Sequence, residues 1–247
     1  MDGRDQPGRD GSNSAIIQHM LILAIDTALD ACAAAVLDTE AGNLIAGESE
    51  AMKRGHAEAL MPLIGRVVAQ SGVAFAALDR IAVTIGPGSF TGLRVGLSAA
   101  RGIALAANKP VVGVTTLAAY AAPVVSQNGE HPVVSAIDAR HDHVYLQVVS
   151  GNGSSLIRPR LAPIEDALAT SRFGSPYLVG NAARILGNRW PSHAVPPLEV
   201  DAQAAPDIAW VGWLGAAVSP DTAPPRPFYL RAPDARPANT AAQSASS

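Results

Sequence analysis

The stretch of this sequence with the clearest potential for chemistry is Gly-Pro-Gly-Ser-Phe-Thr-Gly-Leu-Arg-Val-Gly, at residues 86–96. Glycines between a strand and a helix let backbone amides point at an anion. The stretch is not a Walker A loop, because no Gly-Lys-Ser/Thr follows, and Thr91 stands where a dinucleotide-binding loop has its third glycine. The same spacing fits a tight turn in which Ser89 or Thr91 caps the helix. Gly92 and Gly96 are four residues apart and form a small face, against which this chain or another can pack closely.

Two acidic positions offer a second kind of site. Asp26 and Thr27 follow an apolar run and could hold a magnesium–phosphate group, and Asp138 stands in a similar place; all three also fit simple turns. Ala-Ile-Asp occurs twice, ending at Asp26 and at Asp138, and Asp30 recurs at the same offset as Asp142. The echo is either coincidence in an Ala-rich chain or the mark of two related lobes, each opening with a hairpin that carries an aspartate.

No complete catalytic set is present. His56 and Glu58 do not form a His-Glu-x-x-His zinc motif, and there is no Gly-x-Ser-x-Gly elbow. His141 and His143 are alternate residues that would face the same side, but without a carboxylate partner on that face they fit surface residues better than a site. Cys32 is the single cysteine, so an internal disulfide is excluded. The absence of a catalytic set favours a non-catalytic role.

Composition narrows the class further. The chain has 247 residues, 48% of them hydrophobic and 16% charged, with a net charge of −3. These values fit one domain or two small lobes and argue against a strongly basic nucleic-acid binder. No apolar run approaches the ~20 residues of a membrane helix. Residues 1–19 are polar and predict a disordered leader rather than a signal peptide, which leaves Met20 open as the natural start. Residues 236–247 predict a disordered tail.

Hydrophobic periodicity predicts strands mixed with crossover helices, which is typical of α/β layers. The expected strands are at 21–26, 31–37, 44–49, 80–85, 111–114, 133–138, 144–149 and 177–179. The expected helices are at 56–69, 93–107, 116–125, 161–170, 181–186 and 206–218. Asn181 is the expected cap of the helix at 181–186, and a proline-rich loop is expected around 196–197. Pro62 predicts a kink or a late start in the first helix.

Six segments occur in an order that resembles the TsaB (YeaZ) family: Leu-Ala-Ile-Asp-Thr at 23–27, 55–64, 86–96, 113–117, 137–140 and 229–231. The resemblance spans roughly residues 20–231. It implies an α/β, actin/sugar-kinase/Hsp70-like (ASKHA) fold of two ribonuclease-H-like lobes. It also implies that the nucleotide site at Asp26, Thr27 and Asp138 is degenerate. We expect a leader at 1–19, an N-terminal lobe with the partner-binding helices at 20–125, a C-terminal lobe at 130–219 and a final segment and tail at 220–247. The last helix, 206–218, can pack back on the first lobe.

The resemblance further implies a cytoplasmic, non-catalytic scaffold that pairs with TsaD, the catalytic subunit forming threonylcarbamoyladenosine in tRNA, and recruits the ATPase TsaE. The His-x-x-x-His metal motif of TsaD is missing here. No intrinsic cofactor and no metal site are expected, although the junction with TsaD can take a nucleotide and magnesium. tRNA is expected to bind only through the complex, and the chain alone is expected to form a homodimer. An active ATP-dependent kinase or hydrolase of the ASKHA superfold is the alternative.

The partner surface is expected on two helices, because the helix at 56–69 has more apolar positions than one buried stripe needs. Periodicity does not determine which face points outward. We expect an outward face formed by His56, Leu60, Ile64, Val67, Gly92, Val95, Gly96 and Ala99.

Overall fold

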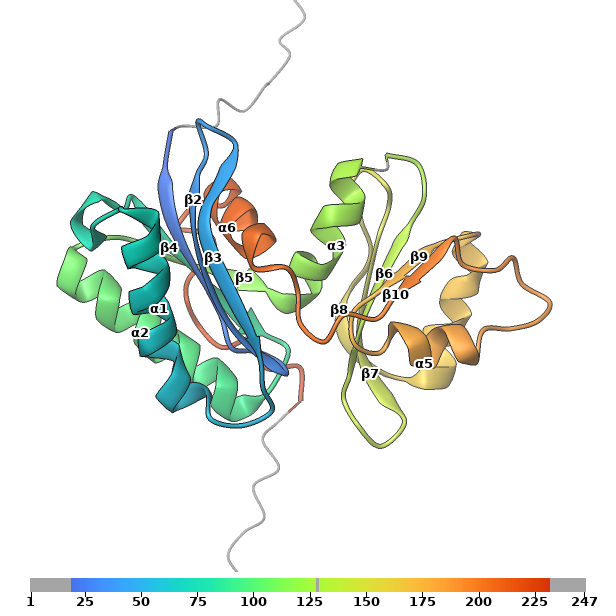
Figure 1. Ribbon diagram of the computed structural model, residues 1–247. Coiled ribbons are helices and arrows are strands. Elements are labelled where there is room, and N and C mark those ends of the chain that lie inside the picture. The colour runs from blue at the N-terminus through green and yellow to red at the C-terminus, as the bar shows by residue number, and fades with distance from the viewer. Residues whose placement is uncertain (1–18, 128, 232–247) are drawn as a thin grey trace, which may run out of the picture.

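The computed structural model describes residues 19–127 and 129–231, arranged as two lobes that are each built on a five-stranded sheet (Figure 1). The first sheet contains β1 (Leu21–Asp26), β2 (Ala31–Asp38), β3 (Asn43–Ala51), β4 (Arg80–Gly86) and β5 (Val111–Thr115). Its order is β3-β2-β1-β4-β5. The first three strands are antiparallel, and β4 and β5 run parallel to β1. The five expected strands of this lobe are confirmed.

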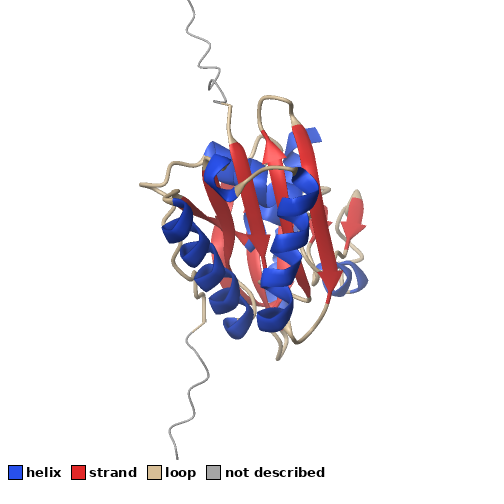
Figure 2. Cartoon of the chain, turned by 60° about the vertical axis from the view of Figure 1, so that its left-hand side comes forward, coloured by secondary structure: helices blue, strands red, loops and turns tan. Residues whose placement is uncertain are grey.

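Helices cover both faces of the first sheet. The helices α1 (His56–Ser71) and α2 (Phe90–Ala107) lie side by side on one face (Figure 2), and α6 (Ile208–Ala217) lies on the other. Because side chains alternate along a strand, Leu23 and Ile25 of β1 pack toward α1 and α2, while Ile22 and Ala24 pack toward α6. The strands β1, β2 and β4 are therefore buried on both sides, which explains their nearly unbroken apolar runs, whereas the edge strand β3 carries exposed polar residues.

The second sheet contains β6 (Val133–Asp138), β7 (His143–Val149), β8 (Ser155–Pro163), β9 (Tyr177–Val179) and β10 (Glu199–Asp201). Its order is β10-β9-β6-β7-β8. One face packs against α3 (Thr116–Gln127), and the other packs against α4 (Ile164–Leu168) and α5 (Ala183–Asn188). Two short 3-10 helices, η1 (Phe75–Ala77) and η2 (Ala169–Phe173), complete the elements.

The two sheets repeat one topology. In each, three antiparallel strands are followed by two that run parallel to the first: β1, β2, β3, β4 and β5 correspond to β6, β7, β8, β9 and β10. Asp26 ends β1 and Asp138 ends β6, so the sequence echo falls on equivalent hairpins. This duplication of a ribonuclease-H-like lobe is the α/β, actin/sugar-kinase/Hsp70-like fold expected from the sequence.

Several local predictions in the second lobe were wrong. Residues 161–163 belong to β8 rather than to a helix, and β10 was missed altogether. β8 is an edge strand, where Pro159 needs no ladder partner and the arginines on either side of it stay exposed. Asn181 does not cap α5; its side-chain oxygen accepts the backbone amide of Asp138 at 2.8 Å instead. In the first lobe, α1 begins at His56 with Pro62 inside it, so the expected late start is wrong as well.

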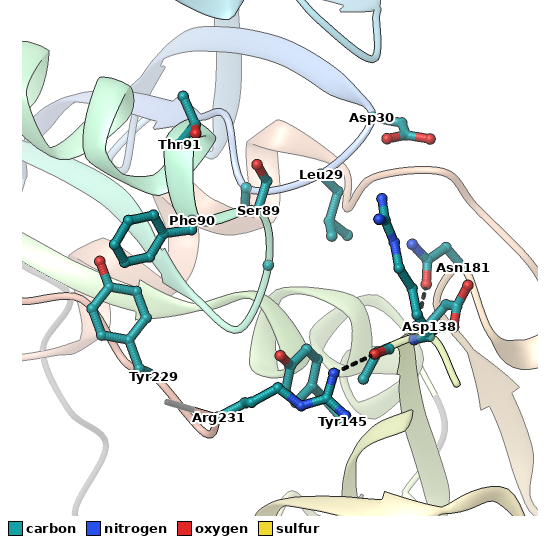
Figure 3. Close-up of a pocket in the computed structure, with 14 residues that line it drawn as sticks. Leu29, Asp30, Ser89, Phe90, Thr91, Asp138, Tyr145, Asn181, Tyr229 and Arg231 are labelled. Atoms are coloured by element: carbon teal, nitrogen blue, oxygen red, sulfur yellow. Dashed lines mark hydrogen bonds between the residues drawn. The ribbon is translucent and has the colours of Figure 1, made fainter. Parts of the chain in front are cut away.

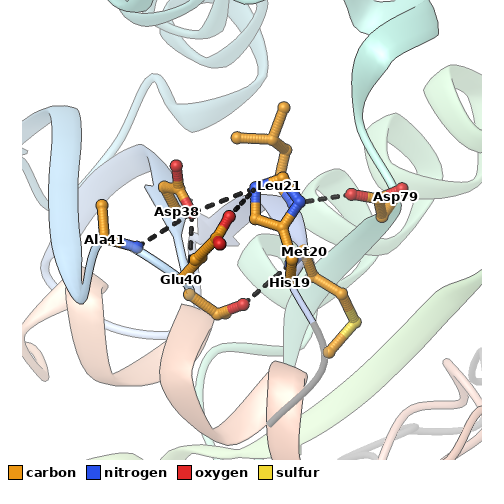
Figure 4. Close-up of polar contacts among 8 residues, drawn as sticks. His19, Met20, Leu21, Asp38, Glu40, Ala41 and Asp79 are labelled. Atoms are coloured by element: carbon orange, nitrogen blue, oxygen red, sulfur yellow. Dashed lines mark hydrogen bonds and ion pairs between the residues drawn. The ribbon is translucent and has the colours of Figure 1, made fainter.

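The start of β1 is hydrogen-bonded to residues next to both neighbouring strands, β2 and β4 (Figure 4). The backbone amide of Met20 donates to Thr39 Oγ1 at 2.8 Å, and the amide of Leu21 donates to Asp79 Oδ2 at 2.8 Å. His19 Nε2 lies 3.4 Å from Asp38 Oδ1. The expectations for residues 1–18 and 236–247 fall outside the described residues. Within the described part of the chain, none of the helices has the length and apolar character needed to cross a membrane.

Candidate functional site

Asp26 is the residue from which a nucleotide site would be built, and it is fully buried. Its Oδ1 accepts hydrogen bonds from the Thr84 hydroxyl at 2.5 Å and from the Ala28 amide at 3.0 Å. Its Oδ2 has no hydrogen-bond partner among the described residues. Burial raises the pKa of the carboxyl above its ordinary 3.8, against the opposing effect of the Thr84 hydrogen bond. Asp26 therefore acts here as part of the packed interior.

The start of α2 covers the β1–β2 turn and so hides Asp26. The amide of Ser89 donates to the Ala28 carbonyl at 2.7 Å, and the Thr27 hydroxyl donates to the Gly92 carbonyl at 2.7 Å. A Cβ on Gly92 would stand 2.1 Å from the Thr27 carbonyl oxygen, and one on Gly88 would stand 2.3 Å from that of Ala28. These glycines are present because two backbones meet there, so the glycine-rich stretch is a packing motif.

The capping interpretation of this stretch is confirmed in part. Ser89 is the N-cap of α2, and its side-chain oxygen accepts the amide of Gly92 at 3.2 Å. Gly96 also packs within the chain, because a Cβ there would lie 2.5 Å from the Thr27 hydroxyl oxygen. The small face of Gly92 and Gly96 is thus filled by the β1–β2 turn.

A polar cleft of about 500 Å³ opens between the lobes beside this turn (Figure 3). Asp138 lies in the cleft, whereas Asp26 and Thr27 do not reach it. The three expected nucleotide-site residues are therefore not brought together. The cleft is lined by Ala28, Leu29, Asp30, Gly88, Ser89, Phe90, Thr91, Asp138, Ala139, Arg140, Tyr145, Asn181, Tyr229 and Arg231.

The β6–β7 hairpin forms the second-lobe wall of the cleft. Its Arg140, His141 and Asp142 have φ angles of 61°, 53° and 55°, a left-handed conformation that L-residues seldom adopt three in a row. The amide of Arg140 donates to Asp138 Oδ1 at 2.8 Å and helps to hold this turn. No group of three or more His, Cys, Asp or Glu side chains in the described part of the chain could hold a metal ion.

A second cavity of about 500 Å³ is a groove between α1 and α2 on the outside of the first lobe. We call it the helix-pair groove. Its wall is mostly apolar, and Met61 is 51% exposed beside it. It is lined by Ala57, Leu60, Met61, Phe90, Thr91, Arg94, Val95, Ser98 and Ala99.

The expected facing of α1 is wrong. His56 is 8% exposed, and Leu60, Ile64 and Val67 are 0–1% exposed, because this apolar stripe packs on the sheet. His56 Nε2 lies 3.0 Å from the Leu29 carbonyl oxygen, which satisfies the buried ring. Of the four positions expected on α2, Gly92 and Gly96 are buried, while Val95 and Ala99 line the groove.

Sequence reasoning missed the residues that form the outer surface of α1. Ala57, Met61 and Gly65 recur every four residues and are exposed. The signal was available, because Glu58 and Arg66 are charged residues beside this line and mark the solvent side of the helix. On α2, the residue that sequence reasoning missed is Phe90, which is 37% exposed at the start of the helix.

Two lobes of one topology with a cleft between their equivalent hairpins define a protein of the actin/sugar-kinase/Hsp70-like class. The family model described as "TsaD: tRNA N6-adenosine threonylcarbamoyltransferase" matches residues 48–191. The chain is 39% identical over 126 residues to the tRNA threonylcarbamoyladenosine biosynthesis protein TsaB of Escherichia coli, covering 51% of this chain and 53% of that protein. It is 33% identical over 221 residues to the tRNA N6-adenosine threonylcarbamoyltransferase of Erythrobacter litoralis, covering 80% and 63%.

Two solved structures of YeaZ-like proteins are also similar to this chain. "YeaZ from Pseudomonas aeruginosa" has a TM-score of 0.69 and 29% identity, covering 85% of this chain and 100% of that one. A Pseudomonas aeruginosa protein described as similar to peptidase YEAZ has a TM-score of 0.71 and 29% identity, covering 86% and 100%. The chain belongs to the TsaD family and, within it, to the TsaB (YeaZ) group. It spans about half the length of the first curated relatives that it matches.

Proposed function

We propose that this chain is a non-catalytic scaffold subunit required for N6-threonylcarbamoyladenosine modification of tRNA. The observation that carries the proposal is the 39% identity over 126 residues to a protein named for that biosynthesis. The catalytic partner in this proposal is a TsaD subunit, and the complex recruits a TsaE ATPase. A cytoplasmic location follows from the proposed tRNA substrate.

The geometry around Asp26 supports a non-catalytic role. In an enzyme of this class the first hairpin would present its carboxylate to phosphate or metal, but here that carboxylate lies behind the Ser89–Ala28 and Thr27–Gly92 hydrogen bonds. A buried carboxyl with a raised pKa is poorly suited to bind a cation. The ATP-dependent kinase or hydrolase alternative would require this packing to open.

The helix-pair groove is the proposed docking surface for the TsaD subunit. It offers small residues on both helices, with Met61 and Phe90 as exposed apolar anchors. Interface centres favour aromatic residues, Met and Arg, and Arg94 adds the last of these. An apolar surface of this kind also supports a homodimer when the chain is alone.

The remaining partners follow from charge and position. A net charge of −3 supports contact with tRNA only through the complex, since phosphate binding requires clustered cations. A nucleotide with magnesium at the junction with TsaD would meet Asp138 as a carboxylate ligand and Arg140 and Arg231 as cations, all three of which line the cleft. A carboxylate suits a magnesium ion, and the two guanidinium groups suit phosphate.

A reconstituted modification assay tests the proposal. TsaD from the same organism, supplied with the threonylcarbamoyl donor and tRNA, should form the modified base only when this chain is added. The isolated chain should not turn over ATP. Modification at full rate without the chain would overturn the scaffold role. ATP hydrolysis by the chain alone, abolished by Asp138→Ala, would favour the kinase or hydrolase alternative.

A further inference from the structure

The segment at 223–231, which we call the strap, follows α6 and connects the two lobes. In the first lobe, the amide of Phe228 donates to the Ile85 carbonyl at 2.7 Å. In the second lobe, Arg231 Nη1 donates to the Ala139 carbonyl at 2.9 Å, directly in the β6–β7 hairpin (Figure 3). The strap is thus hydrogen-bonded to β4 through Phe228, to β5 through the Ala223 carbonyl, which accepts the Gly113 amide at 2.9 Å, and to the cleft wall through Arg231.

Between Phe228 and Arg231 the strap contacts the first turn of α2. The rings of Tyr229 and Phe90 have centroids 5.3 Å apart and are tilted by 35° (Figure 3). On α2, Arg94 Cζ lies 3.7 Å from the centroid of the same Phe90 ring. Arg94, Phe90 and Tyr229 therefore form one continuous set of contacts, and Arg231 extends it to the hairpin.

This set of contacts joins two cavities that share a wall. Phe90 and Thr91 line both the helix-pair groove and the interlobe cleft. Phe90 is 37% exposed and Tyr229 is 41% exposed, so a partner seated in the groove would cover Phe90 and limit the freedom of the ring stacked on it. Arg231 stands two residues beyond Tyr229 on the same strap and donates to the hairpin.

The end of the strap at Arg231 contacts the β6–β7 hairpin, whose backbone is strained. Arg140, His141 and Asp142 all have positive φ, and such backbone persists only where its surroundings over-determine it. The amide of Ala139 donates to the His143 carbonyl at 3.0 Å, and that of His143 to the Arg140 carbonyl at 3.1 Å, so both amides report on the state of the turn.

We propose that the strap couples docking on the helix-pair groove to the β6–β7 hairpin of the cleft, through Arg94, Phe90, Tyr229 and Arg231. A partner that covers Phe90 and Arg94 holds Tyr229, which keeps Arg231 on the Ala139 carbonyl. Because coupling between sites is reciprocal, the strap contacts also raise affinity for the partner. The inference rests on the proposed function, since the occupant of the groove is the TsaD subunit.

Hydrogen exchange of the Ala139 and His143 amides, with and without TsaD, tests the coupling. In the parent, TsaD should slow exchange at both amides at least fivefold. In Tyr229→Ala and in Arg231→Ala, TsaD should still bind, about fivefold to tenfold more weakly, without slowing exchange. Tyr229→Phe keeps the ring and should behave as the parent. Arg226→Ala, an exposed strap residue of the same charge, is the matched control and should also behave as the parent.

The double variant Tyr229→Ala/Arg231→Ala separates one pathway from two independent effects. Along one pathway its loss of affinity should equal that of the worse single variant, whereas multiplied losses would overturn the coupling. TsaD binding to the parent with no slowing at the hairpin would overturn the coupling alone. Failure of the folded parent to bind TsaD would overturn the proposed function, and the coupling with it.

Discussion

The two sides of α1 should respond oppositely to the same new charge. Ile64 is fully buried against the first sheet, while Met61, about one turn earlier in the helix, is 51% exposed in the helix-pair groove. Ile64→Asp should therefore unfold the chain. Met61→Asp should leave it folded and abolish most of its binding to TsaD.

The magnitudes separate the two variants clearly. Truncating a buried isoleucine costs about 2–5 kcal/mol, and an unpaired carboxylate at Ile64 adds several more. Their sum rivals the ~5–15 kcal/mol that holds a whole domain together. A surface change such as Met61→Asp stays within about 0.5 kcal/mol for folding. As an interface anchor, Met61 is worth about 2 kcal/mol or more, a roughly 30-fold weaker Kd.

Circular dichroism with thermal melting and calorimetric titration with TsaD measure both effects on the same samples. Gln70→Glu adds one negative charge at an exposed position of the same helix that does not line the groove, and it should leave folding and binding near those of the parent. A cooperative melt of Ile64→Asp close to that of the parent would refute the packing of α1. Normal TsaD affinity of folded Met61→Asp would refute the groove as the docking surface.

Three further tests examine contacts within the chain. Gly92→Ala should lower the free energy of unfolding by about 1–3 kcal/mol, because its Cβ would stand 2.1 Å from the Thr27 carbonyl oxygen. Gly102→Ala, with open space around it on the same helix, should raise the free energy of unfolding by about 0.5–1 kcal/mol. Urea unfolding measures both, and a more stable Gly92→Ala than Gly102→Ala would contradict this packing. Burial raises the pKa of Asp26 above 3.8, so the folded state binds its proton more tightly than the unfolded state, and stability from this group falls as pH rises from 3.8 through the raised pKa. Asp26→Asn should remove that loss, and the gap between variant and parent, measured in urea at acid and at neutral pH, should shift in favour of the variant; an unchanged gap refutes it. Arg80→Ala should cost about 1–3 kcal/mol, because Arg80 Nη1 donates to the carbonyls that end α6, and an unchanged thermal melt would count against that role.

Much of the first lobe could be predicted because its signals are local. β1 and β2 are nearly continuous apolar runs, and the Ala-Ile-Asp echo marks the equivalent hairpins of the two lobes. β8 and β10 were missed for a physical reason. Both are edge strands: β8 has Pro159 between two exposed arginines, and β10 is mostly exposed, so neither has the burial that produces a pattern.

The facing of α1 shows a different limit. Leu60 and Met61 are both apolar, so periodicity alone allows either to face the sheet, yet one is 1% exposed and the other 51%. What decides is the position of Glu58 and Arg66, since a charged side chain is costly to bury. Arg66 pairs with Glu48 of β3 at the sheet edge, a contact across 18 positions of sequence that no local pattern contains.

Asp26 and Asp138 show why equivalent residues can acquire different roles. Both follow Ala-Ile at the end of the first strand of a lobe, but only Asp26 has the start of α2 packed over its turn. The glycines at 88 and 92 let that packing occur, since any Cβ there would meet a backbone carbonyl oxygen. The same close approach fixes the first turn of α2, and with it Phe90, between the cleft and the helix-pair groove. The packing that hides Asp26 therefore also gives the two cavities their shared wall. A chain with an open phosphate site on the first hairpin would have to move Phe90. It would then lose the contact through which we propose that docking is coupled to the cleft.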